Sequence, residues 1–146
     1  MLQATIIYAS LTGNTEEIVE HVTELLEERE VDVTLIDCED YEGTEFIHAD
    51  ICIIGTYTYG EGELPEEIVP VYESIPELDL TGKIFGVCGS GDTLYEEFYC
   101  QSIDDFEQVF EQSGAQKGSE SVKIDLDMDD EDEERLEIFV EELINK

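Results

Sequence analysis

The segment "SLTGNT", residues 10–15, contains three hydroxyl side chains, an amide and a glycine, and lies between an apolar run, "ATIIYA", and a helical pattern, "EEIVEHVTELLEE". A turn from a strand into a helix presents free backbone N–H groups that bind phosphate without a cation. The hydroxyls of Ser10, Thr12 and Thr15 are further donors, and glycine permits close backbone approach. The segment predicts a phosphate-binding nest. An ordinary strand-to-helix turn with a capping threonine is the alternative.

Two more loops follow apolar runs and carry aromatic residues. They read "TYTYGEGELP" (56–65) and "GSGDTLYEEFY" (89–99). Their tyrosines suit stacking on a flat ring, although each alone is also typical of a half-buried surface position: Tyr57, Tyr59, Tyr95 and Tyr99. No Lys follows the glycine of the nest, and Leu94 replaces the third glycine of a dinucleotide fingerprint, so neither nucleotide motif fits. A phosphate nest with aromatic walls indicates flavin mononucleotide (FMN).

The remaining pattern predicts the elements that position these loops. Nearly continuous apolar runs at 4–9, 51–55 and 84–89 are typical of central strands, whereas the alternating runs at 31–37 and 122–127 are typical of edge strands. Helical spacing predicts three long helices, with these apolar residues facing the core: Ile18, Val19, Val22, Leu25, Leu26; Ile103, Phe106, Val109, Phe110; Leu136, Phe139, Val140, Leu143, Ile144.

The helix starts and connections are predicted from cap residues and prolines. Ser102 with Asp105, and Asp130 with Glu133, are the expected starts of the last two helices. A weaker helix is predicted over 65–75, where Pro70 kinks it or delays its start.

Strands that alternate with helices predict an α/β fold, an open doubly wound five-stranded parallel sheet of order 2-1-3-4-5. In such sheets the ligand lies beyond the carboxyl ends of the strands, which is where the three loops fall.

Composition limits the class of protein. The chain has 146 residues, 41% of them hydrophobic, with 40 acidic and 6 basic residues and a formal net charge of −34. We expect a single domain over residues 1–146. Nucleic acids and anionic membranes are excluded as partners, because both are bound through Lys and Arg. The acid excess has two open interpretations: a solvated, salt-tolerant surface, or attraction of basic partners.

The same features predict location and thiol state. No apolar stretch approaches the ~20 residues that span a bilayer, and no signal-peptide pattern is present, so we expect a cytoplasmic protein. The four cysteines have no C-x-x-C spacing, which favours reduced thiols over a zinc site or a redox pair: Cys38, Cys52, Cys88 and Cys100. His21 and His48 are expected to be structural.

The chain resembles the flavodoxins over essentially its whole length, through "SLTGNT", "TYTYGEGELP" and "GSGDTLYEEF". Because no long insertion interrupts the last strand, it resembles their short-chain branch. The resemblance implies a phosphate site closed by Thr58 and formed by Ser10, Leu11, Thr12, Gly13, Asn14 and Thr15.

The resemblance also implies how the flavin ring is held. Tyr59 would pack on its inner face, where many flavodoxins have Trp, and Tyr95 on its outer face. The peptide between Gly60 and Glu61 would lie beside flavin N5 and turn its carbonyl toward that atom when it is protonated. The pyrimidine end would be surrounded by Gly91, Asp92, Tyr95 and Tyr99.

The function implied is that of a low-potential one-electron carrier, a monomer with non-covalently bound FMN that shuttles between semiquinone and hydroquinone, and not an enzyme. Acids on the flavin loops would lower the second potential: Glu61, Glu63, Asp92, Glu96 and Glu97. The partners implied are a flavodoxin or ferredoxin reductase and acceptor oxidoreductases, with basic docking surfaces.

Three other functions are open alternatives. A small flavin enzyme, either a quinone reductase or a flavodoxin-like activator of ribonucleotide reductase, would need a substrate pocket or a dimer interface. A receiver domain would need acids where Ser10 and Thr56 stand. An interaction module without a cofactor would be colourless.

Overall fold

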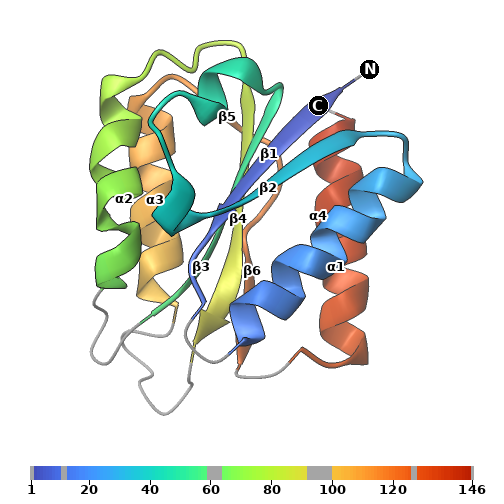
Figure 1. Cartoon of the computed structure of the whole chain (residues 1–146). Helices are drawn as coiled ribbons and strands as arrows, with labels where there is room; N and C mark the ends of the chain where they lie inside the picture. Colours follow the sequence, from blue (N-terminus) through green and yellow to red (C-terminus); the bar gives the residue numbers. More distant parts are fainter. Residues whose placement is uncertain (1, 11–12, 59–63, 92–99, 126–127, 146) are drawn as a thin grey trace.

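The computed structural model describes residues 2–10, 13–58, 64–91, 100–125 and 128–145. Its centre is a parallel sheet of six strands (Figure 1). They are β1 (Gln3–Tyr8), β2 (Asp32–Asp37), β3 (Ile51–Tyr57), β4 (Ile84–Gly91), β5 (Gln116–Lys117) and β6 (Val122–Asp125). The order β2-β1-β3-β4-β5, with β6 also paired to β4, confirms the predicted sheet order.

The last strand of the predicted sheet is divided into two pieces. β5 pairs with Ile84 and Phe85, and β6 pairs with β4 from Cys88 to Gly91. Between them the chain stays attached, because the Gly118 N–H donates to the Phe85 carbonyl at 2.9 Å. A Cβ at Gly118 would overlap the Ile84 side chain, so this close approach requires glycine. The sequence pattern predicted β6 but not the two-residue β5; residues 126–127 lie outside the described residues.

Two helices cover each face of the sheet (Figure 1). One face carries α1 (Asn14–Glu28) and α4 (Asp130–Ile144), and the other carries α2 (Val69–Ser74) and α3 (Gln101–Gln112). Short 3₁₀ turns complete the connections: η1 (Cys38–Asp40), η2 (Glu45–His48), η3 (Glu66–Ile68) and η4 (Ile75–Glu77). The helix predicted over 65–75 is therefore a sequence of η3, α2 and η4. Pro70 lies in the first turn of α2, where its missing N–H has no partner to lose.

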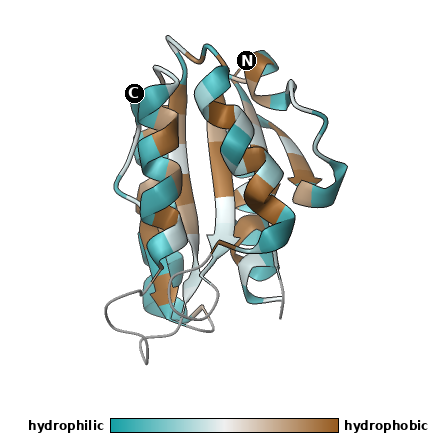
Figure 2. Cartoon of the chain, turned by 90° about the vertical axis from the view of Figure 1, so that its left-hand side faces the viewer, coloured by the Kyte–Doolittle hydropathy of each residue, from teal (hydrophilic) through white to brown (hydrophobic). Residues whose placement is uncertain are grey.

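The core has two halves because neighbouring residues of a strand point to opposite faces. In β3, Ile51 and Ile53 pack with α1 and α4, whereas Cys52 and Ile54 pack with α2 and α3. Every apolar residue predicted to face the core from the helices is buried, except Ile144, which is partly buried. Figure 2 shows the hydrophobic strands enclosed between helices whose outer surfaces carry hydrophilic residues.

The helix starts differ from prediction by a residue or two. α4 begins with a capping box in which Asp129 accepts from the Asp132 N–H at 2.8 Å, one position before the predicted Asp130 and Glu133. α3 begins at Gln101, so Ser102 lies inside the first turn and is not its cap. Its side chain instead bonds the end of β3, at the Tyr57 carbonyl.

Candidate functional site

The loops predicted to carry the chemistry start from one end of the sheet, which we call the rim. Here the carboxyl ends of β1, β3 and β4 meet the N-terminal ends of α1, α3 and α4, at the lower end of Figure 1. Backbone bonds tie the strand ends together: the Ala9 N–H donates to the Gly55 carbonyl at 3.0 Å, and the Thr58 N–H to the Ser90 carbonyl at 3.3 Å.

The predicted phosphate nest is the start of α1. Gly13 precedes the helix with φ of 93°, a left-handed conformation that suits glycine, and an added Cβ would meet nothing within 4 Å. The Ser10 hydroxyl oxygen accepts from the N–H groups of Gly13 (3.1 Å) and Glu16 (3.3 Å). The N-cap residue, Gly13, has no side chain, so Ser10 provides the side-chain oxygen in the first turn of the helix. Two backbone donors thus converge on one oxygen, that of the Ser10 hydroxyl, at the positive end of a 15-residue helix.

Thr15 contributes to this nest differently from the prediction. Its side chain is buried, with the hydroxyl 3.1 Å from Ser90 Oγ and 3.5 Å from the Thr56 carbonyl oxygen. The hydroxyl therefore faces the strand ends, and the backbone N–H is the Thr15 group that remains for an anion. The hydrogen bond to Ser90 ties the nest to the end of β4.

Thr58 and Ser102 join the second loop to α3. The Thr58 hydroxyl oxygen accepts from the Ser102 N–H at 3.1 Å and lies 3.0 Å from Ser102 Oγ. Ser102 Oγ donates to the Tyr57 carbonyl at 2.8 Å. The Tyr57 hydroxyl in turn donates to Glu67 at 2.9 Å. The sequence predicted Ser102 only as a helix cap, because its partners Tyr57 and Thr58 lie 45 and 44 positions away in the chain.

Close contact between β3 and β4 holds the rim in place. A Cβ at Gly89 would overlap the carbonyl oxygen of Thr56, and one at Gly55 would overlap the Val19 side chain. Gly91 ends β4 opposite Asp125 of β6 and is half-buried. Glycine at these positions lets the strands and α1 approach closely, and so fixes the spacing between the three loops.

The structure brings together six of the predicted site residues at this rim: Ser10, Gly13, Asn14, Thr15, Thr58 and Gly91. The others lie outside the described residues: Leu11, Thr12, Tyr59, Gly60, Glu61, Asp92, Tyr95 and Tyr99. The second tyrosine loop is described only up to Thr58 and from Leu64.

The basic residues that the structure describes are occupied elsewhere. Lys123 pairs with Asp104 at 2.9 Å, and Arg135 with Asp132 at 2.8 Å. Arg29 and Lys117 each contact two carboxylates within 3.4 Å, and Lys83 donates to the Ala49 carbonyl at 2.7 Å. In this part of the chain no Lys or Arg bonds the nest, so its described donors are neutral. No basic side chain among the described residues would therefore neutralise the charge of an anion held here.

The thiols do not contribute reactive groups. All four cysteines are free, as predicted, and all four are buried. Burial, with a smaller effect of nearby acids at Cys38, raises the pKa of Cys38 and Cys52 to about 12, and burial alone raises that of Cys88 to about 12. Among the described residues there is no group of three His, Cys, Asp or Glu that fits a metal ion, and no helix long and apolar enough to cross a membrane.

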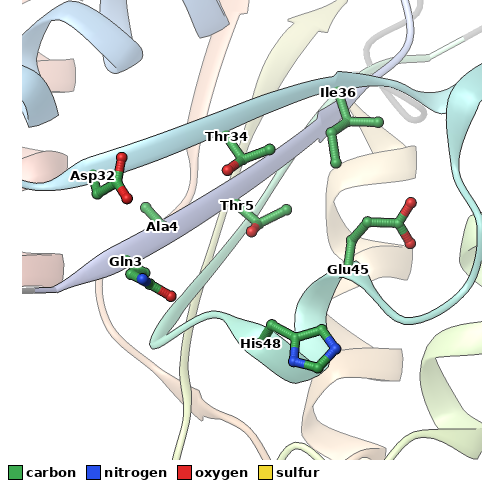
Figure 3. A pocket seen from close by; sticks show the side chains of 8 residues that line it. All are labelled: Gln3, Ala4, Thr5, Asp32, Thr34, Ile36, Glu45 and His48. Atoms are coloured by element: carbon green, nitrogen blue, oxygen red, sulfur yellow. The ribbon is translucent and has the colours of Figure 1, made fainter.

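A separate groove of about 250 Å³ lies along β2 and the first half of β1, beside η2 (Figure 3). It is lined by Gln3, Ala4, Thr5, Asp32, Thr34, Ile36, Glu45 and His48. This open face exists because only 3₁₀ turns, and no long helix, connect β2 to β3. Since it shares no residue with the rim, it does not extend the candidate site.

Comparisons with known proteins show one family. The family model described as flavodoxin matches residues 6–139. A curated relative, probable flavodoxin 2 of Bacillus subtilis, is 35% identical over 147 residues, covering 100% of this chain and 97% of its own.

Solved structures of flavodoxins also match nearly the whole chain. A flavodoxin of Streptococcus pneumoniae TIGR4 has 51% identity and a TM-score of 0.95, with 98% of each chain covered. A short-chain flavodoxin associated with a PDU bacterial microcompartment has 42% identity and a TM-score of 0.97, covering 99% of this chain and 98% of its own.

Proposed function

The chain belongs to the flavodoxin family, and from that premise we propose that it is a low-potential, one-electron carrier that holds FMN non-covalently and passes electrons between redox proteins. The observation that carries the proposal is the N-terminus of α1, where backbone donors and the Ser10 hydroxyl converge without a cation. This donor set matches the doubly charged phosphate of FMN.

The described residues fit that cofactor in kind. The N–H groups of the nest would hold the phosphate, with Thr58 approaching from the second loop. Ser10 now supplies the oxygen that accepts from Gly13 and Glu16, which is the role that a phosphate oxygen would take. Once a phosphate supplies it, the Ser10 hydroxyl is free to donate instead. Leu11 and Thr12 complete the predicted phosphate set.

Bound FMN supplies the electron-transfer chemistry, and the chain tunes it. Tyr59 and Tyr95 would cover the two faces of the ring and exclude water, and Gly91, Asp92 and Tyr99 would surround its pyrimidine end. The peptide carbonyl between Gly60 and Glu61 would accept a hydrogen bond from the proton held at N5, and glycine permits the backbone turn that this requires.

Acidic residues set the potential of the last electron. At about 10 Å and an effective dielectric of about 40, one carboxylate raises the cost of a new negative charge by roughly 0.8 kcal/mol, or about 35 mV for one electron. Several acids lie on the flavin loops in the sequence, and no Lys or Arg among the described residues bonds the nest to offset them. We therefore infer a low second potential, so that the protein works between the two more reduced states of the cofactor.

The partners proposed are a reductase and acceptor oxidoreductases with basic docking surfaces. Opposite charges would speed their encounter more than they strengthen the complex. The acid excess in the sequence supports this choice of partner.

The decisive experiment is a visible spectrum followed by an anaerobic reductive titration of the purified protein. We expect a yellow protein that passes through a long-wavelength blue intermediate when a chemical reductant is added, and that NAD(P)H reduces only when a separate reductase is present. A chain that neither quenches FMN fluorescence nor retains FMN through gel filtration would contradict the proposal. Steady turnover of NAD(P)H with a quinone would instead favour the flavin-enzyme alternative.

A further inference from the structure

Ser102 connects two parts of the rim that belong to different loops. It lies in the first turn of α3 and is 0% exposed. Its hydroxyl donates to the Tyr57 carbonyl at 2.8 Å, and its N–H donates to the Thr58 hydroxyl oxygen at 3.1 Å. One residue thus holds the first part of the second loop, Tyr57 and Thr58, against the start of α3.

The direction of these hydrogen bonds follows from the number of protons. A serine hydroxyl has one proton, and the bond to the Tyr57 carbonyl uses it. Since Ser102 Oγ lies 3.0 Å from the Thr58 hydroxyl oxygen, the proton between them must come from Thr58. In this arrangement Thr58 has no proton to give to a phosphate. It regains one only if Ser102 turns its own proton from Tyr57 toward Thr58.

Thr58 also stabilises the N-terminus of α3. The residue that precedes this helix, Cys100, has φ of 53° and supplies no side-chain cap. The Thr58 oxygen accepts from the second N–H of the helix, which is the bond that an N-cap side chain normally makes. Thr58 of the second loop therefore caps α3. If Thr58 moved toward a ligand, the hydrogen bond from the Ser102 N–H in the first turn of the helix would lengthen or break.

We propose that Ser102 is a positioning residue of the cofactor site. It sets the direction of the Thr58 hydroxyl and of the backbone from which the segment 59–63 begins, and through them the affinity for FMN and the separation of its two reduction potentials. This inference rests on the proposed function. Ser102 acts through Thr58 and Tyr57 and does not itself touch the cofactor.

The test compares Ser102→Ala, Thr58→Val and the double variant with wild type and with Ser113→Ala. Ser113 is a matched control, because it lies just past the other end of α3, is buried, and donates to the Phe110 carbonyl at 2.6 Å. The measurements are the FMN dissociation constant from fluorescence quenching, both reduction potentials, and amide exchange of the FMN-free protein.

We expect Ser102→Ala to weaken FMN binding about fivefold to tenfold, the effect of one lost hydrogen bond or slightly more. It should also change the separation of the two potentials and speed exchange of the Thr58 amide in the FMN-free protein. Ser113→Ala should lower the melting temperature but leave FMN affinity within twofold. In the Thr58→Val background, the loss of affinity caused by Ser102→Ala should be smaller than in wild type, because the route through Thr58 is already broken and only the hydrogen bond to the Tyr57 carbonyl remains to be lost.

The outcomes separate the two proposals. Wild-type protein that fails to retain FMN overturns the proposed function and this inference with it. Wild-type protein that binds FMN, beside a Ser102→Ala variant with affinity within twofold and unchanged potentials, overturns this inference alone. If Ser102→Ala does not fold, Thr58→Val at a half-buried position carries the test: unchanged exchange of the Ser102 amide in that variant overturns the inference.

Discussion

Two single residues, Glu45 and Gly89, affect stability in ways that their residue types alone would not suggest. Glu45 is one of many acids, yet its carboxylate accepts from the N–H groups of Glu42 (2.7 Å) and Gly43 (2.9 Å). Desolvation opposes its ionisation, but the backbone hydrogen bonds outweigh that effect and lower the pKa of Glu45. Gly89 has no side chain at all, yet its position beside the Thr56 carbonyl tolerates nothing larger.

Glu45→Gln is expected to lower the free energy of unfolding by about 1 kcal/mol at pH 7, since a charge-assisted bond becomes a neutral one at a partly exposed site. A carboxyl whose pKa is lowered on folding stabilises the fold above its unfolded pKa, and this stabilisation is lost as the pH falls through its folded pKa. The difference from wild type should therefore shrink as the pH falls below the unfolded pKa of about 4.3, and disappear once the pH lies below the lowered pKa of the folded state.

Urea unfolding at pH 7, 5 and 3 measures this dependence. Glu42→Gln removes one carboxylate from the same turn without removing the acceptor, and is the control. An equal loss for both variants at pH 7 would show that general charge, and not the Glu45 hydrogen bonds, is responsible.

Gly89→Ala is expected to lower the free energy of unfolding by about 3 kcal/mol, because the new methyl group overlaps backbone that cannot move without separating β3 from β4. FMN affinity should fall with it. Gly43→Ala is a useful comparison: Gly43 has φ of 116° but open space around it, so it isolates backbone strain from overlap. A Gly89→Ala protein as stable as wild type would refute the close contact between the strands.

At the level of elements, the sequence predicted most of the architecture. Apolar runs distinguish the central strands from the edges because both faces of β1, β3 and β4 are covered. Helical spacing identified the buried face of α1, α3 and α4 for the same reason. The misses have local causes: β5 has only two residues, too few for any periodicity, and α3 has no cap of its own because Thr58 supplies one from a distant loop.

The candidate site was predictable to a similar extent. A strand followed by hydroxyl residues and a helix indicated the nest around Ser10 and Gly13. The orientation of the Thr15 hydroxyl was not predictable, because it depends on Ser90, a residue 75 positions away in the chain. The bonds of Ser102 to Tyr57 and Thr58 were not predictable for the same reason, since tertiary packing alone brings these residues together.

The capping box of α4 allows a direct test at this scale. Asp129→Ala should lower the free energy of unfolding by about 1 kcal/mol, because the first turn loses the bond from the Asp132 N–H. Asp130→Ala removes the same charge from the next position without removing the cap. Thermal unfolding of both variants decides the matter: equal melting temperatures would mean that the cap contributes nothing.

At the level of the whole molecule, the large negative charge affects both the stability of the fold and the reduction potential. With 40 acidic and 6 basic residues, mutual repulsion opposes the compact state and every added electron. Salt screens both effects over a Debye length of about 10 Å at 0.1 M and about 3 Å at 1 M.

Raising the salt concentration from about 0.05 to 1 M should therefore raise the second reduction potential by tens of millivolts, since the new negative charge is repelled less. Spectroelectrochemical titration at several NaCl concentrations measures it, and KCl at the same ionic strength checks that the effect is general. A potential that does not depend on ionic strength would contradict the electrostatic account.

The break between β5 and β6 has a practical consequence for engineering. Gly118 and Ser119 are buried on one side of it, but Glu120 is exposed, and the chain there runs along the outer border of the sheet. A flexible peptide spliced between Glu120 and Ser121 would leave both halves of the divided strand attached to β4. This junction is thus suited to a tether, through which a chosen redox enzyme can be fused to the carrier while its rim stays open.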